Sequence, residues 1–223
     1  LHEIDKLALV KLNALIDKVK DAYNAYDFHI VVSSIHNFCI TEMSNFYLDI
    51  IKDRLYCTGE KSVERRAAQT AMYKILSAVA KMIAPILCFT AEEIWKYIPH
   101  SSDDDARSIF MNQMPDKIDV SVDDKFIEKW NEIYKLRSDV TKALESRRQN
   151  KFIGAPLEAK VIIHADGENY SKFSALKDIL EKVFIVSAVD ICHGGSGEFT
   201  SDNFEGMSYD VEKAAGNKCE RCW

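Results

Sequence analysis

The sequence contains little glycine and proline, with 8 and 4 among its 223 residues, and no long uncharged apolar run. The longest apolar stretch, Ile75 to Thr90, is interrupted by Lys81 and Pro85, so we expect a soluble protein without a membrane-spanning helix. The scarcity of turn-forming residues argues against an all-β sandwich, while 47% hydrophobic residues exclude a disordered chain. The composition therefore predicts a folded, mainly helical protein.

An excess of basic residues is also absent, because 29 Lys and Arg stand against 35 Asp and Glu. A formal charge of -6 excludes a polycation that binds nucleic acid over its whole surface, so any RNA contact must be a local patch. The chain begins with Leu1, and residues 1–26 contain four acidic residues, unlike a signal or transit peptide. We expect a piece of a longer, cytoplasmic protein.

Apolar residues in the first hundred positions recur every three or four residues, which is typical of amphipathic helices. They predict helices over residues 4–26 and 28–56, the second with a break near Thr41 and Ser44. Ser62 is expected to cap a third helix that ends about one turn before Pro85. Thr90 and Glu93 have the spacing of a capping box, which predicts a short helix over residues 91–98.

The rest of the sequence changes character. Residues 100–120 are acidic and lack helical periodicity, which predicts a linker at a domain edge. A long helix is expected over residues 123–150, followed by two β-branched stretches at 157–164 and 183–191 around a helix at 171–181. The predicted fold class is therefore mainly α. We expect three segments: a helical bundle with an acidic linker at its end (1–120), a long helix plus a small α/β unit (121–197), and the start of an incomplete zinc-binding tail (198–223).

Cys219 and Cys222 have the spacing that places two thiolates on one tight turn, as in tetrahedral zinc sites. Two ligands do not hold zinc, and no second pair follows; Cys192 with His193 is the other nearby group of soft ligands. Either the pair is half of a zinc site in a longer parent protein, or the tail is disordered. Three of the other cysteines lie in apolar helical runs, which suits reduced thiols.

Two clusters of basic residues are candidates for contacts with RNA phosphates. The first flanks one helix-to-helix turn, beside Tyr56 as a stacking face, and contains Lys52, Arg54, Lys61, Arg65 and Arg66. The second follows the end of the long helix and contains Arg147, Arg148 and Lys151. The alternative for each residue is an ordinary solvated helix surface, with Arg54 paired to Asp53.

Arg221 and Trp223 form a third candidate contact, because an exposed indole beside a guanidinium can stack an unpaired base and hold its backbone. The alternative is an indole that packs on the cysteine turn. No Ser/His/Asp constellation, glycine-rich phosphate loop or pair of catalytic carboxylates is evident in the sequence. We therefore predict no catalytic residue in this chain.

Two stretches resemble the anticodon-binding helical domain of class I aminoacyl-tRNA synthetases. The first is DFHIVVSSIHNFCI continuing to SNFYLDIIKDRLY (residues 27–56), and the second is RRAAQT continuing to IAPILCFTAEEIW (residues 65–95). The words FYLD and KDRLY resemble the isoleucyl branch of the family more than the valyl or leucyl branches. Residues 137–145, IGAPLEA at 153–159 and KCERCW at 218–223 are similar to later segments of that branch, so the resemblance spans nearly the whole chain.

The resemblance implies a parent protein that activates isoleucine with ATP and Mg²⁺, joins it to isoleucine tRNA and hydrolyses mischarged valine in a separate editing domain. The family's ATP-binding words HIGH and KMSKS are absent, so we expect the catalytic and editing domains elsewhere in a monomeric parent protein that contacts no membrane. The resemblance also implies zinc in the parent. The chain itself is expected to recognise the anticodon arm; the alternative is a structural module of a valyl or leucyl enzyme that packs on the catalytic body.

Overall fold

The computed structural model describes residues 1–216, which divide into two compact units, Leu1–Val122 and a second unit from Asp123 onward. Helices form the first unit, and a four-stranded sheet with helices forms the second. This architecture confirms the predicted fold class, mainly α with a small α/β appendage. Within the described part of the chain, no helix combines the length and apolar character needed to cross a membrane.

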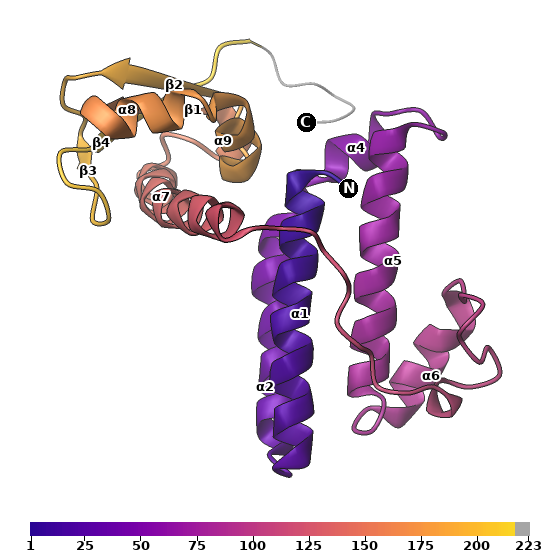
Figure 1. Cartoon of the computed structure of the whole chain (residues 1–223). Helices are drawn as coiled ribbons and strands as arrows, with labels where there is room; N and C mark the ends of the chain where they lie inside the picture. The colour runs from indigo at the N-terminus through magenta and orange to yellow at the C-terminus, as the bar shows by residue number, and fades with distance from the viewer. Residues whose placement is uncertain (217–223) are drawn as a thin grey trace. The chain divides into compact units, whose positions relative to one another are not determined.

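The first unit is a bundle in which α1, α2 and α5 run alongside one another (Figure 1). The predicted second helix is an α-helix that widens into a π-helix across Thr41 and Ser44 and is interrupted at Ile51. The elements of this unit are α1 (Glu3–Asn24), α2 (Phe28–Asn37), the π-helix η1 (Phe38–Tyr47), α3 (Leu48–Ile50), α4 (Lys52–Tyr56), α5 (Val63–Ile83), α6 (Cys88–Tyr97) and the 3₁₀ turn η2 (Ile109–Met111).

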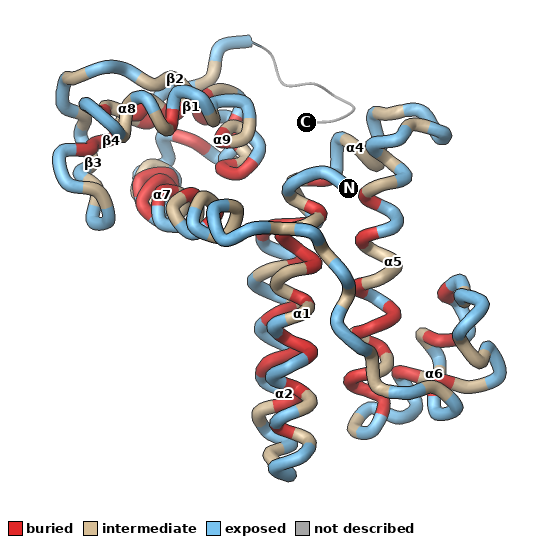
Figure 2. The backbone as a smooth tube through the Cα atoms, viewed as in Figure 1, coloured by how far each residue is buried: buried red, intermediate tan, exposed pale blue. Residues whose placement is uncertain are grey.

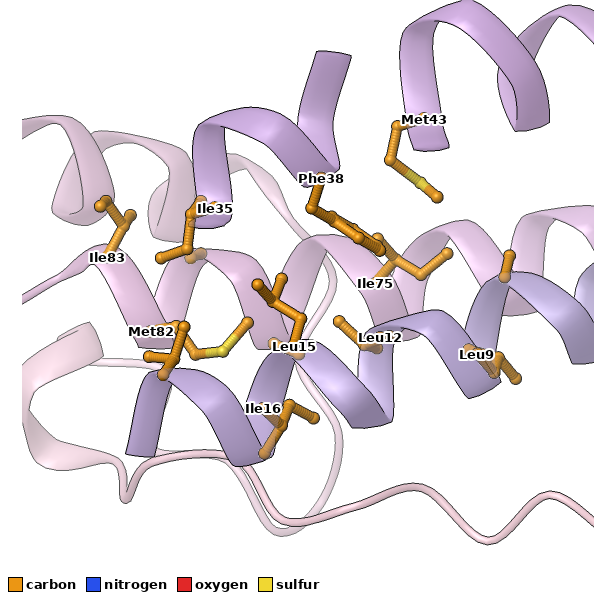
Figure 3. Packing of buried hydrophobic residues seen from close by; sticks show 14 of the residues in the cluster. Leu9, Leu12, Leu15, Ile16, Ile35, Phe38, Met43, Ile75, Met82 and Ile83 are labelled. Carbon is orange, nitrogen blue, oxygen red and sulfur yellow. The ribbon is translucent and has the colours of Figure 1, made fainter. Parts of the chain in front are cut away.

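The apolar stripe of α1 forms the centre of the bundle. Leu9, Leu12 and Ile16 are 0% exposed and follow one another at three- and four-residue spacing. They belong to one cluster with Phe38 of η1 and Met82 of α5, so three segments distant in sequence share a core (Figure 3). Along α1, α2 and α5 buried positions recur among exposed ones (Figure 2). Burying one such side chain stabilises the fold by about 1.5–3 kcal/mol.

The helix ends follow the predicted chemistry at α5 and depart from it at α6. Ser62 caps α5, because its Oγ accepts the backbone N–H of Arg65 at 3.1 Å. The helix runs to within two residues of Pro85, further than predicted. The capping box at Thr90 is wrong: α6 begins at Cys88, so Thr90 lies inside the first turn, and Glu93 pairs with Lys96 at 3.0 Å. Burial of Ala91 and Trp95 sets this register in place of the threonine cap.

Residues 100–120, the predicted acidic linker, are held against the bundle. Ile109 is 2% exposed and belongs to the bundle core. Asn13 of α1 exchanges two hydrogen bonds of 2.8 Å with the backbone of Ile118. Asp104, from the acidic run, accepts a hydrogen bond of 2.6 Å from Lys81. These polar contacts to distant residues leave no periodic signal in the sequence.

The second unit contains the predicted βαβ arrangement, with its connecting helix divided in two. Its strand order is β2-β1-β4-β3, with β1 parallel to β2 and antiparallel to β4, and β3 antiparallel to β4. The elements are α7 (Asp124–Gln149), the 3₁₀ turn η3 (Pro156–Glu158), β1 (Ala159–Ala165), α8 (Gly167–Ser174), α9 (Lys177–Phe184), β2 (Ala188–His193), β3 (Phe199–Thr200) and β4 (Ser208–Lys213).

The predicted zinc-binding tail from residue 198 is wrong over its first part, because residues 199–213 complete the sheet. In β4, buried Tyr209 and Val211 alternate with more exposed Asp210 and Glu212, and Ile162 of β1 lies opposite Asp210. This is the alternation of a strand with one face in the core. The short run is mostly polar, so its membership of the sheet depends on pairing with β1.

Candidate nucleic-acid interface

The first predicted basic cluster surrounds the turn between α4 and α5, at residues 57–62. We define the basic turn as Lys52, Lys61, Arg65 and Arg66. All but the half-buried Arg65 are exposed, and Lys52 forms an ion pair with Asp49 one helical turn earlier. Both helices reach the same end of the bundle, so these cations and Tyr56, which is 74% exposed, lie at that end (Figure 1).

Arg54 belongs to the same predicted cluster but is engaged inside the bundle. Its two terminal nitrogens donate to the two carboxylate oxygens of Asp5, each at 2.8 Å, and one also donates to the backbone oxygen of Glu64 at 2.9 Å. The Asp5 side chain is 0% exposed and that of Arg54 is 14% exposed. The geometry therefore gives Arg54 a structural role in place of the predicted phosphate contact. Its partner is 49 positions away rather than the adjacent Asp53.

Hydrogen bonds stabilise the charge of this buried carboxylate. Burial alone would raise the pKa of Asp5, but donors from Arg54, the backbone N–H of His2 and the Tyr47 hydroxyl outweigh it, so the pKa lies below its usual value. The pKa of Arg54 is raised, because its interaction with Asp5 outweighs the effect of burial. Asp5 and Arg54 thus form a charged pair at neutral pH.

In the second cluster, at the end of α7, one residue forms contacts within the fold and two are exposed. Arg147 donates to Glu198 at 2.5 Å, and its guanidinium lies 4.9 Å from the ring centroid of Phe152. Arg148 and Lys151 remain exposed, although Arg148 pairs with Glu145 on the preceding turn at 2.9 Å. Arg147 therefore ties α7 to the chain before β3, while Arg148 and Lys151 face solvent.

The remaining predicted site residues lie outside the described part of the chain: Cys219, Arg221, Cys222 and Trp223. Their zinc-binding and base-stacking roles stay predictions. In residues 1–216 no three His, Cys, Asp or Glu side chains gather closely enough to hold a metal ion. Within that range the free thiols are Cys39, Cys57, Cys88 and Cys192.

The opposite end of the bundle carries exposed aromatic rings that the sequence patterns did not single out. Tyr26 and Phe28, at the turn between α1 and α2, are 79% and 48% exposed, and their ring centroids lie 6.2 Å apart. Phe89, in the first turn of α6, is 94% exposed. The hydroxyl of Tyr23 donates to the backbone oxygen of Met82 at 2.8 Å, which joins the ends of α1 and α5.

We call Tyr26, Phe28 and Phe89 the aromatic end. Exposed aromatic rings are platforms for unpaired nucleobases. Aromatic residues at helical spacing are usually core residues, so the helical pattern offers no reason to select these three. Their positions beside helix ends, after Ala25 and Leu87, are the signal that distinguishes them from core positions.

Comparison with known proteins gives one family and a set of relatives. A family model described as the anticodon-binding domain of tRNA ligase matches residues 5–163. Over its whole length the chain is 46% identical to an isoleucine–tRNA ligase of Caldicellulosiruptor saccharolyticus, 43% to that of Syntrophotalea carbinolica and 42% to that of Natranaerobius thermophilus. It covers 23–24% of these relatives, so it spans about a quarter of their length.

Proposed function

This chain belongs to the family of anticodon-binding domains of tRNA ligases, and on that premise we propose that it recognises the anticodon arm of isoleucine tRNA as part of an isoleucine–tRNA ligase. The match over residues 5–163 carries the proposal, because it covers nearly all of the bundle as well as α7. The relatives at 42–46% identity support the choice of isoleucine. The alternative, a structural module of a valyl or leucyl enzyme, is not favoured by either comparison.

The surface chemistry of the bundle suits an RNA hairpin. A hairpin presents phosphates along its stem and unpaired bases in its loop, and the two ends of the bundle offer cations and aromatic rings respectively. We assign phosphate contacts to the four cations of the basic turn, Lys52, Lys61, Arg65 and Arg66, with Arg148 as a separate contact of the second unit. Base stacking is assigned to the aromatic end. The surrounding negative charge of the chain limits binding to these patches.

The chemical steps are assigned to the parts of the parent protein that this chain does not include. In this proposal, ATP and Mg²⁺ act in a catalytic domain there, and zinc would be held by Cys219, Cys222 and further ligands from outside the chain. We expect the parent protein to be monomeric and cytoplasmic. Binding energy gained at the anticodon would favour the correct placement of the acceptor end of the tRNA. Contacts far from the reacting atoms would in this way raise the rate of the reaction.

A titration tests the proposal. The chain is titrated with a synthetic anticodon stem-loop of isoleucine tRNA at several salt concentrations, with a valine stem-loop for comparison. We expect binding of the isoleucine stem-loop at low salt, with an affinity that falls as salt rises, because phosphate contacts release counterions. The double variant Lys61→Ala/Arg66→Ala should lower the slope against salt by about two, whereas the control Lys117→Ala should not. Absence of binding at low salt, or salt-independent binding, would overturn the proposal.

A further inference from the structure

We propose that Asp5 and Arg54 are positioning residues for RNA binding: the buried pair fixes the shape of the basic turn, and so sets where its cations meet phosphates. The inference rests on the proposed function. It assigns a task to two residues that touch no RNA and that lie 49 positions apart in the sequence.

The pair is the point at which four segments meet. Asp5 lies in the first turn of α1 and accepts the backbone N–H of His2 at 3.0 Å. The hydroxyl of Tyr47, at the end of η1, donates to the same carboxylate at 2.9 Å. Arg54 brings α4 to it with two bonds and reaches the first turn of α5 through the backbone oxygen of Glu64. A guanidinium gripped on both terminal nitrogens has its orientation fixed as well as its charge balanced.

Apolar packing holds α4 only in part. The helix has five residues, none of them buried; Leu55 is partly buried against the bundle core, and the buried Ile51 precedes the helix. A helix this short is also not stable by itself, because the cost of nucleation is spread over too few hydrogen bonds. The link from Arg54 to Asp5 therefore anchors α4, and with it Lys52 and the start of the turn.

A chain of hydrogen bonds extends the anchor to the other side of the turn. Thr58 Oγ1 donates to the backbone oxygen of Arg54 at 2.6 Å, and Ser62 Oγ donates to Thr58 Oγ1 at 2.9 Å. Ser62 Oγ in turn accepts the backbone N–H of Arg65 at 3.1 Å. The buried pair is thus connected, through Thr58 and Ser62, to the helical turn that carries the two arginines.

Position matters here because phosphate contacts fix the register of a protein on its nucleic acid. Cations held at a set spacing match several phosphates at once, whereas cations on a loose turn must be ordered during binding. That ordering costs conformational entropy and weakens affinity without removing a single charge. The inference therefore separates the arrangement of the cations from their number.

The test compares two carboxylates of the same bundle, that of the buried Asp5 and that of the half-buried Asp104. Asp5→Asn removes the charge at the basic end, and Asp104→Asn is the matched control, because Asp104 also accepts from a cation, a tyrosine hydroxyl and a backbone N–H. Affinity for the isoleucine anticodon stem-loop is measured on the whole chain at a temperature where both variants are folded by circular dichroism. Hydrogen exchange of the amides at 57–66 is followed in parallel.

We expect Asp5→Asn to weaken binding about tenfold and to speed exchange at 57–66, while Asp104→Asn leaves both unchanged. Thr58→Val, which interrupts the hydrogen-bond chain and leaves the buried pair intact, should weaken binding about threefold. This variant keeps the test decisive if Asp5→Asn does not fold.

The outcomes separate the two proposals. Failure of the unsubstituted chain to bind overturns the proposed function, and this inference with it. If the unsubstituted chain binds and Lys61→Ala/Arg66→Ala weakens that binding, unchanged affinity in Asp5→Asn and Thr58→Val overturns the positioning role alone. Equal losses in Asp5→Asn and Asp104→Asn overturn it too, because they would show that general destabilisation causes the effect.

Discussion

The two ends of the bundle are held by similar devices built from different parts of the sequence. At each end a carboxylate accepts hydrogen bonds from a cation, a tyrosine hydroxyl and a backbone N–H: Asp5 from Arg54, Tyr47 and His2, and Asp104 from Lys81, Tyr73 and Ser101. One device stands beside the basic turn. The other holds the acidic segment after α6 against α5. Charged residues that the sequence marks as surface are thus structural at both ends.

The difference between the devices lies in the cation. Arg54 grips both oxygens of Asp5 and also reaches the backbone of α5, so it joins three helices. Lys81 makes one contact with Asp104, and its ammonium also lies 5.3 Å from the ring centroid of Trp95. A planar guanidinium fixes direction, whereas an ammonium acts as a point charge. We infer that the side-chain geometry is more rigid at the basic end than at the other end of the bundle.

The largest expected effect that tests this difference is on stability. Asp5→Ala should destabilise the bundle by about 3–5 kcal/mol, because it leaves the mostly buried Arg54 without its partner. Asp104→Ala should cost less, since the flexible Lys81 side chain, which carries a single ammonium, can turn toward water. Denaturant unfolding followed by circular dichroism measures both values. An equal or larger loss for Asp104→Ala would contradict the ranking of the two ends.

Acid should weaken both ends together. Burial raises the pKa of Asp104, but hydrogen bonds from Lys81 and Ser101 prevail and lower it to about 2; the pKa of Asp5 is also lowered. A carboxylate with a depressed folded-state pKa contributes stability that is complete above its unfolded pKa of about 3.9 and is lost as pH falls through the folded value.

We therefore expect the free energy of unfolding to fall between about pH 4 and pH 2, and part of this fall to disappear in Asp104→Asn. Urea unfolding at a series of pH values measures it. The same pH dependence in Asp104→Asn as in the unsubstituted chain would show that this carboxylate does not contribute to the loss of stability in acid.

The aromatic end should contribute to RNA affinity in a way that salt does not alter. Phe89→Ala is expected to weaken binding of the anticodon stem-loop by about 1–3 kcal/mol with an unchanged salt slope, because stacking releases no counterions. Tyr97→Ala is the control, since Tyr97 is 81% exposed on the same helix but outside the aromatic end. Titration at several salt concentrations distinguishes this loss from that of a basic residue. Equal losses in the two variants would remove Phe89 from the site.

The smallest expected effect concerns the helix cap at the basic end. Ser62→Ala should destabilise the chain by about 1 kcal/mol, because it removes the cap of α5 and interrupts the chain of hydrogen bonds to Thr58. Thermal unfolding measures this change, with Ser33→Ala as a control at an exposed serine. A loss no greater than that of the control would show that the cap is not needed at this end.

Much of the fold could be predicted because local patterns carry it. The stripe of α1, the cap at Ser62 and the alternation of β1 each lie within a few consecutive residues. The start of α6 could not be predicted, because burial of Trp95 outweighs the cap at Thr90. Arg54 shows the same limit in the candidate site, because a basic residue on a short helix looks exposed until its distant partner is known.

The sequence by itself determined the helical class of this protein, its similarity to tRNA-binding domains and the list of cations available to RNA. It could do so because periodicity, short motifs and charge are properties of neighbouring residues. Only the tertiary structure decided which of those cations are free. Arg54 and Arg147 are held by Asp5 and Glu198, 49 and 51 positions away, whereas Lys61 and Arg66 face solvent. A charge becomes structural when folding places an opposite charge beside it away from water, and that placement depends on the whole chain.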